Sequence, residues 1–190
     1  MFLFEGAEEL DWAGPWEVFS AWAQSWPEDG VEVVSLARTP EPVTCAKGLR
    51  VLPAHGWEGC GRLDLLIYPG GVGVRPHLED EAVLAWVRGL AAQGTILASV
   101  CTGAWVLAKA GLLDGRPATT HWIGLDLLAN LGKEIDVRPE ARFIDDGDIL
   151  TAAGVSAGID LALHLVARLH STDRAREVRR YIQYDPAPPV

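Results

Sequence analysis

The sequence has few of the residues that mark extracellular, metal-binding or nucleic-acid-binding proteins. Its 190 residues include only three cysteines: Cys45, Cys60 and Cys101. Their number is odd and their spacing is not that of a metal site, so we expect neither a disulfide framework nor a bound metal. Positive charge is also scarce, because 16 Lys and Arg face 26 Asp and Glu, for a net charge of −10. That charge would repel a phosphate backbone, so no nucleic-acid partner is expected.

Long hydrophobic runs are missing as well. The N-terminal residues lack the basic and apolar regions of a signal peptide. The most apolar late segment, residues 155–169, is interrupted by Asp160, His164 and Arg168, which excludes a membrane span. We therefore expect a cytoplasmic protein with reduced cysteines. A chain of 190 residues, 49% of them hydrophobic, is expected to form one globular domain over residues 1–190.

Apolar runs and helix-spaced segments alternate along the chain. The runs predict strands over 31–37, 63–68, 95–100, 117–120 and 135–137, and the helical spacing predicts helices over 14–23, 79–93, 121–131, 155–170 and 172–183. Hairpins are expected over 43–53 and 141–150, a short first-strand stub at 1–4, and an extended proline-rich tail over 185–189. Because the strand runs are continuously apolar, we predict a doubly wound α/β fold. Its mostly parallel sheet would be covered by helices on both faces.

Cys101 stands between a predicted buried strand and a predicted helix that begins near Gly103, with almost no loop. Such a tight strand-to-helix turn is typical of nucleophile positions in hydrolases. The N-terminus of the helix would favour the thiolate. We therefore predict that Cys101 is reactive, whereas Cys45 and Cys60, in hairpin and loop context, are expected to be inert.

Several residues are candidates to assist Cys101 at the carboxyl ends of the strands. Asp11, expected to precede the first helix, would be partly desolvated and have a raised pKa, or would simply cap that helix. The amides of Gly70, Gly71 and Thr102 could form an oxyanion-type cradle, or Gly70 and Gly71 could form only a tight turn. His121 could orient the thiol or have a structural role.

Four further residues are candidates for the lining of a pocket. Trp105 and Trp122 lie near the predicted strand ends, and the turn at Val155 and Ser156 would add to an apolar wall. The other tryptophans, at positions 12, 16, 22 and 26, are expected to be core residues, although the first helix is also the one candidate for a subunit interface.

The motifs together resemble the ThiJ/PfpI superfamily, whose fold is flavodoxin-like and similar to class I glutamine amidotransferases. The resemblance covers nearly the whole chain and rests on residues 10–11 (LD), 14–15 (GP), 17–19 (EVF), 69–73 (PGGVG), 99–103 (SVCTG), 111–122 (GLLDGRPATTHW), 157–160 (AGID) and 184–189 (YDPAPP). The most similar branches are the isonitrile hydratases and the ligand-sensing N-terminal domains of AraC-type regulators.

The resemblance implies that Cys101 is the nucleophile and Asp11 the general acid and base of a cofactor-free homodimer. It implies hydration of an isonitrile, a small-molecule substrate, to an N-substituted formamide through a covalent thioimidate. Thr102 replaces the histidine of the superfamily's peptidases, which argues against a Cys–His dyad. Two alternatives stay open: a redox or small-molecule sensor of the stress-response kind, standing alone without a DNA-binding domain, and glyoxalase or deglycase activity on 2-oxoaldehydes.

Overall fold

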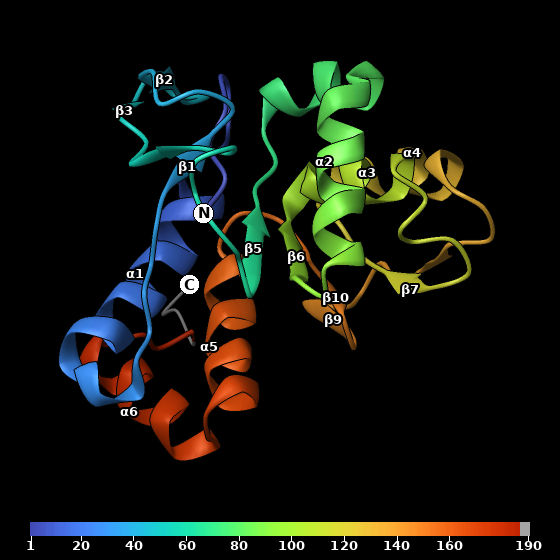
Figure 1. Cartoon of the computed structure of the whole chain (residues 1–190). Coiled ribbons are helices and arrows are strands. Elements are labelled where there is room, and N and C mark those ends of the chain that lie inside the picture. The colour runs from blue at the N-terminus through green and yellow to red at the C-terminus, as the bar shows by residue number, and fades with distance from the viewer. Residues whose placement is uncertain (187–190) are drawn as a thin grey trace.

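The centre of the molecule is a four-stranded sheet, seen in a computed structural model that describes residues 1–186 (Figure 1). Strand β6 (Ile96–Val100) lies between β5 (Leu65–Tyr68) and β10 (Ile149–Ala152) and is parallel to both. Strand β9 (Phe143–Asp146) pairs antiparallel with β10, giving the order β5-β6-β10-β9. The predicted mostly parallel sheet is therefore confirmed. The last three residues of the predicted tail, 187–189, lie outside the described residues.

The sheet continues beyond β5 through the first residues of the chain. The Phe2 N–H donates to the Ile67 carbonyl at 3.0 Å, and the Leu3 N–H donates to the Leu36 carbonyl at 2.7 Å. Residues 1–4 thus lie between β5 and β1 (Leu36–Ala37), which pairs in turn with β4 (His55–Gly56). The strand predicted over 31–37 is wrong for its first five residues. Residues 1–4 make hydrogen bonds to this segment only from Val34 onward, where the Met1 amino group donates to the Val34 carbonyl.

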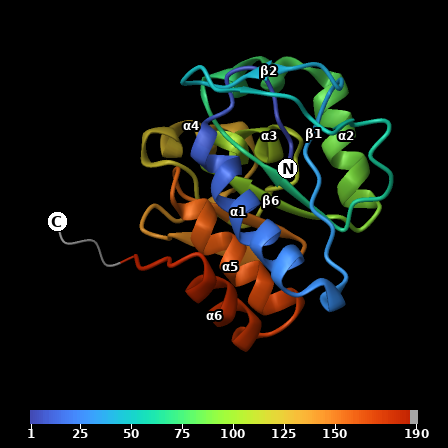
Figure 2. The same ribbon diagram turned by 90° about the vertical axis from the view of Figure 1, so that its left-hand side faces the viewer.

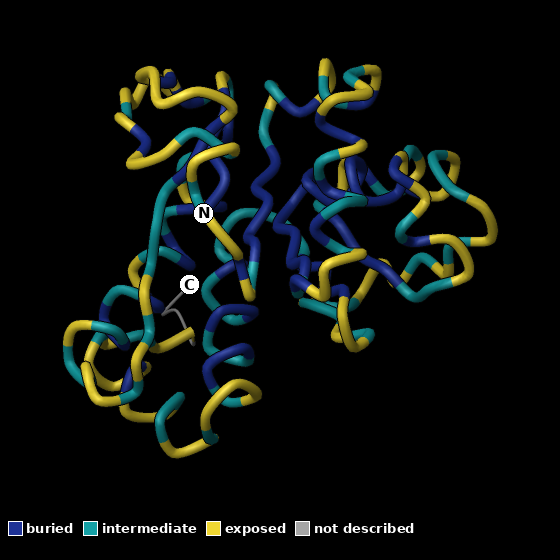
Figure 3. The backbone as a smooth tube through the Cα atoms, in the orientation of Figure 1, coloured by how far each residue is buried: buried dark blue, intermediate teal, exposed yellow. Residues whose placement is uncertain are grey.

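Helices cover both faces of the sheet. On one face lie α1 (Glu9–Ser25), α5 (Ala157–Leu169) and α6 (Thr172–Tyr181); on the other lie α2 (Glu81–Ala92), α3 (Ala104–Lys109) and α4 (Leu125–Leu131) (Figures 1 and 2). The core is divided accordingly into two apolar clusters, with Phe19 and Leu161 in one and Val87 and Leu128 in the other. Figure 3 shows the buried backbone concentrated along the sheet strands and the inner sides of these helices. This is the predicted doubly wound arrangement.

Two-residue strands and 3₁₀ turns lie around the central sheet. Strands β2 (Val43–Thr44) and β3 (Arg50–Val51) form the predicted hairpin outside the main sheet, and β7 (Pro117–Ala118) pairs in parallel with β8 (Asp136–Val137). The β9–β10 hairpin turns at Gly147, as expected. Four 3₁₀ turns complete the described part: η1 (Pro27–Asp29), η2 (Val72–Glu79), η3 (Cys101–Gly103) and η4 (Trp122–Gly124). None of the helices within residues 1–186 is long and apolar enough to cross a membrane.

Helix α1 begins earlier than the sequence predicts, at Glu9 instead of Gly14. Pro15 lies inside the helix, where it packs against the α5 face at Gly158. The first turn of the helix contains the acidic residues Glu9 and Asp11. Acidic side chains interact favourably with a helix N-terminus, which explains the early start. Asp11 therefore does not precede the helix, and Glu8 occupies the N-cap position in its place.

The tryptophans of α1 are mostly interior residues. Trp12 and Trp22 are buried, and the indole of Trp22 donates a hydrogen bond to Asp29 at 2.6 Å. The expectation of core residues is confirmed for these two. The tryptophan-rich α1 as a subunit interface stays a prediction, and Trp16 on this helix is only half-buried.

Candidate active site

Cys101 occupies a strained turn between β6 and α3. Its φ is +57°, a left-handed conformation that costs energy for a residue with a side chain. The turn is held by main-chain and side-chain bonds: the Cys101 N–H donates to the Ala153 carbonyl at 2.9 Å, and the Thr120 hydroxyl donates to the Cys101 carbonyl at 2.6 Å. Two residues later, a side chain at Gly103 would collide with the Tyr68 carbonyl oxygen. The predicted strand–cysteine–helix turn is therefore confirmed.

Asp11 reaches this turn from the first turn of α1. Its side chain is completely buried, and Oδ2 accepts a hydrogen bond from the Gly70 N–H at 2.9 Å. The other oxygen, Oδ1, is buried with no hydrogen-bond partner of normal geometry among residues 1–186. Burial, opposed by the Gly70 N–H and aided by the charge of Glu8, raises the pKa of Asp11 to about 7. The predicted rise is confirmed, and this carboxyl can both release and accept a proton near neutrality.

The electrostatics of Cys101 differ from the expectation. Burial and the nearby Asp11 carboxylate raise the pKa of Cys101 to about 12. The N–H and hydroxyl of Thr102 and the N–H of Val155 lower it, but by less. The prediction of a ready thiolate is wrong for the resting site. The helix N-terminus is outweighed, because the thiol is only 7% exposed and lies beside a second acidic group.

Asp11 and Cys101 therefore form one coupled proton-binding pair. The Cys101 thiol lies beside the Asp11 carboxyl and lowers its pKa through a hydrogen bond. When Asp11 takes up a proton, the negative charge that disfavours the thiolate disappears. The arrangement can thus keep a thiol at rest and pass protons between sulfur, carboxyl and a bound molecule.

The glycine amides expected to cradle an oxyanion have other partners. The Gly70 N–H is engaged by Asp11, and the Gly71 N–H donates to the Thr102 hydroxyl at 3.1 Å. These amides position side chains of the site, and they do not form the open cradle that was expected. Thr102 itself contacts Cys101 through both its N–H and its hydroxyl.

The remaining candidates are spread around the turn. His121 caps η4, its Nδ1 accepting from the Ile123 N–H at 3.3 Å, and its ring packs against Gly154. Trp105 is buried and donates to the Gly124 carbonyl at 3.0 Å, so it belongs to the core and not to a pocket wall. Trp122 is 74% exposed and its ring lies beside that of His121.

Val155 and Ser156 form the turn that leads into α5. Val155 has a φ of +53°, unusual for a β-branched residue, and its N–H faces both Asp11 and Cys101. The Ser156 hydroxyl accepts a hydrogen bond from Arg142 at 3.0 Å. Sequence reasoning missed the backbone role of Val155 and the contribution of Thr120, because main-chain conformation and buried hydroxyl contacts leave no residue pattern.

The other two cysteines are structural. Cys45 is buried, and burial raises its pKa, whereas the Cys60 thiol donates to the Trp57 carbonyl at 3.1 Å. No cluster of three or more His, Cys, Asp or Glu side chains that could hold a metal ion occurs within the described part of the chain.

Residues 1–168 match the DJ-1/PfpI family. The chain belongs to the DJ-1/PfpI family. It is 42% identical, over 187 residues, to "Isonitrile hydratase" of Pseudomonas putida, an alignment that covers 98% of this chain and 78% of that protein.

Other relatives in the family are regulators. "HTH-type transcriptional regulator CdhR" of Pseudomonas aeruginosa is 37% identical over 138 residues, which cover 72% of this chain and 40% of the regulator. Among solved structures, a ThiJ/PfpI family protein from Pseudomonas syringae superposes with a TM-score of 0.89 at 33% identity, over 100% of this chain and 76% of its own. Drosophila melanogaster DJ-1beta has a TM-score of 0.84 at 22% identity, over 97% and 96% of the chains, and this shows a shared fold.

Proposed function

We propose that this protein is a cysteine-dependent hydro-lyase that adds water to an isonitrile and releases an N-substituted formamide. The observation that carries the proposal is the buried Asp11–Cys101 pair, a thiol beside a carboxyl whose pKa is about 7. The 42% identity to an isonitrile hydratase supports it. The proposed reaction needs no cofactor, because the nucleophile and the proton donor are both side chains of the chain.

The first half of the reaction forms a bond from sulfur to carbon. Asp11, in its protonated form, gives its proton to the terminal carbon of R–N≡C as Cys101 Sγ attacks that carbon. The thiol proton returns to the Asp11 carboxylate, so the net change is addition of S–H across the carbon, giving the thioimidate R–N=CH–S–Cys. The coupled pair suits this step, since protonated Asp11 no longer disfavours the developing thiolate.

The second half returns the free thiol. Protonated Asp11 first gives its proton to the thioimidate nitrogen; the carboxylate then takes a proton from water as the hydroxyl adds to the thioimidate carbon, giving R–NH–CH(OH)–S–Cys. The resulting tetrahedral adduct expels the sulfur, which recovers its proton, and R–NH–CHO leaves. The net reaction converts R–NC and water to R–NH–CHO, with the Cys101 thiol and protonated Asp11 regenerated. A pKa near 7 allows the same carboxyl to act as acid and then as base near neutral pH.

A small-molecule sensor is the second candidate function, and the similarity to transcriptional regulators favours it. A sensor would bind its ligand at Cys101 without turnover. The raised pKa of Cys101 argues against a peroxide sensor, because oxidation requires thiolate character. We further propose a homodimer in a reducing, cytoplasmic setting, with a small molecule as the physiological partner.

The deciding experiment supplies p-nitrophenyl isonitrile to the wild-type protein and follows formation of the formamide. Cys101→Ala should abolish turnover, and Asp11→Asn should slow it at least about 100-fold, as expected for loss of a general acid and base. Denatured-protein mass spectrometry should show a thioimidate adduct on Cys101 in the slow Asp11→Asn variant. Methylglyoxal serves as the comparison substrate. Lactate formation without formamide formation, or full activity in Cys101→Ala, would overturn the proposal.

A further inference from the structure

The Val155 turn is a strained element that supplies an N–H to the reactive pair. Its φ of +53° is one that a β-branched side chain adopts only when the surroundings enforce it. The N–H of Val155 faces the Asp11 carboxyl and the Cys101 thiol, and it stabilises the ionised form of each. Something outside the pair must hold this turn in place.

Arg142 forms hydrogen bonds to residues on both sides of Val155. On the N-terminal side, its carbonyl accepts the Ala153 N–H at 3.0 Å. On the C-terminal side, its guanidinium donates to the Ser156 hydroxyl at 3.0 Å and to Asp160 Oδ2 at 2.6 Å. Arg142 thereby bonds both to the residue after β10 and to the start of α5, and Val155 lies between these two contacts.

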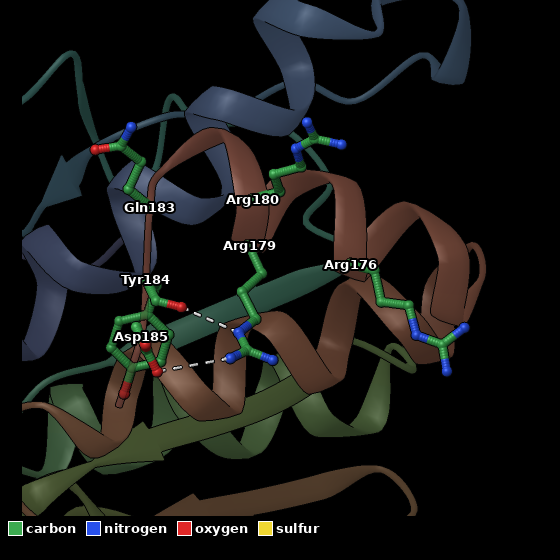
Figure 4. A pocket seen from close by; sticks show the side chains of 6 residues that line it. All are labelled: Arg176, Arg179, Arg180, Gln183, Tyr184 and Asp185. Carbon is green, nitrogen blue, oxygen red and sulfur yellow. Dashed lines mark hydrogen bonds and ion pairs between the residues drawn. The ribbon is translucent and has the colours of Figure 1, made fainter. Parts of the chain in front are cut away.

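Asp160 is held in turn by the segment that follows α6. The Tyr184 hydroxyl donates to Asp160 Oδ1 at 3.0 Å, so both carboxylate oxygens of Asp160 are engaged. Two hydrogen bonds join Tyr184 to Arg179. The Tyr184 carbonyl accepts from Arg179 Nε at 3.0 Å, and the Tyr184 N–H donates to the Arg179 carbonyl at 3.1 Å. Figure 4 shows the Arg179 guanidinium pointing at the Tyr184 carbonyl and at Asp185.

We propose that Arg142, Asp160 and Tyr184 are positioning residues that set the reactivity of Cys101 by holding the Val155 turn against the Asp11–Cys101 pair. The largest shifts in the pKa of Asp11 and of Cys101 come from burial and from other groups, and Arg142 contacts Ala153 and Ser156 on either side of Val155, so the three residues act through the turn. The part of this inference that concerns turnover rests on the proposed function. The predicted effect on the reactivity of the Cys101 thiol is independent of that function.

Other charges near the pair stay unchanged when this network is altered. Glu8 acts on Asp11 from the N-cap of α1, and Lys47 pairs with Glu8 and Glu9. Removing Arg142 alone would leave Asp160 with an uncompensated charge. The double variant Arg142→Gln/Asp160→Asn removes both charges together, so an effect that persists in it comes from lost positioning.

The test measures alkylation of Cys101 by iodoacetamide from pH 7 to pH 10, with peptide mapping to separate it from Cys45 and Cys60. Arg142→Gln and the double variant should react about tenfold more slowly than wild type across this range, the size expected for losing one hydrogen bond to an ionised group. Tyr184→Phe should react about threefold more slowly, because it loses only the outermost bond. With p-nitrophenyl isonitrile, kcat should fall while KM changes less than about twofold, the pattern of lost transition-state stabilisation.

The matched control is Arg168→Gln. Arg168 also links α5 to the β9–β10 hairpin, through Asp145 at 2.8 Å, but it touches nothing in the Val155 turn. Wild-type alkylation in Arg168→Gln, beside slowed alkylation in Arg142→Gln, supports the proposal. Equal rates in these two variants, or wild-type rates in the double variant, overturn it. If the wild-type protein hydrates no isonitrile, the proposed function fails, whereas the alkylation rates still decide this inference.

Discussion

Asp11 should make the fold less stable as the pH rises, and replacing it with asparagine should remove that dependence. Burial raises the pKa of this carboxyl from 3.8 to about 7 in the folded protein. Between these two values the folded chain holds a proton that the unfolded chain has released, so stability falls as pH rises through the window. At about 1.36 kcal/mol per pKa unit, the loss between pH 5 and pH 8 is about 2.5 kcal/mol.

Urea unfolding of wild type and Asp11→Asn at pH 5, 6, 7 and 8 measures this loss. The stability of the variant relative to wild type should increase by about 2.5 kcal/mol from pH 5 to pH 8, whatever the constant offset between them. Asp80→Asn is the control. Although burial opposes it, Arg38 and the Val83 N–H lower the pKa of Asp80, so this residue is ionised in both states above pH 5. Parallel pH curves for wild type and Asp11→Asn would refute the reasoning.

Two further substitutions test how the Cys101 turn is built. Gly103→Ala should destabilise the protein by about 3 kcal/mol in urea unfolding, because the methyl group would collide with backbone oxygens of Tyr68 and Pro69; Gly89→Ala, in open space on α2, should instead stabilise it by about 1 kcal/mol. An equal effect at the two glycines would contradict the packing argument. Thr120→Val should cost about 2 kcal/mol, because it leaves the buried Cys101 carbonyl without its 2.6 Å bond, whereas Thr120→Ser should retain most of the stability. Identical losses in the valine and serine variants would show that the hydroxyl is not what holds the turn.

The sequence predicts the layers of this fold well, because the strand runs over 63–68 and 95–100 are continuously apolar and only a doubly covered sheet buries such runs. It also locates Cys101, whose position between a strand run and a helix start is visible in the residues alone. The start of α1 was misplaced, since Pro15 marks the first turn of many helices but here lies within one.

The electrostatics of the site could not be predicted in the same way. The pKa of Cys101 depends on burial and on a carboxyl 90 positions away in the chain, neither of which is a local pattern. The positive φ of Val155 likewise has no residue pattern that signals it, although its neighbours Ala153 and Ser156 both bond to Arg142. A pattern of residues can name the nucleophile, whereas its proton affinity depends on the assembled surroundings.

The close backbone approach behind Cys101 limits how this site can diversify. A side chain at Gly70 would lie 2.5 Å from both the N and the hydroxyl oxygen of Thr102, so no larger residue fits there without moving the turn. Under the proposed function, a change of substrate preference therefore has to come from side chains farther from the thiol, while the main chain around Cys101 stays the same. Directed evolution for altered substrates should accordingly randomise the outer positions and leave residues 70–71 and 101–103 untouched.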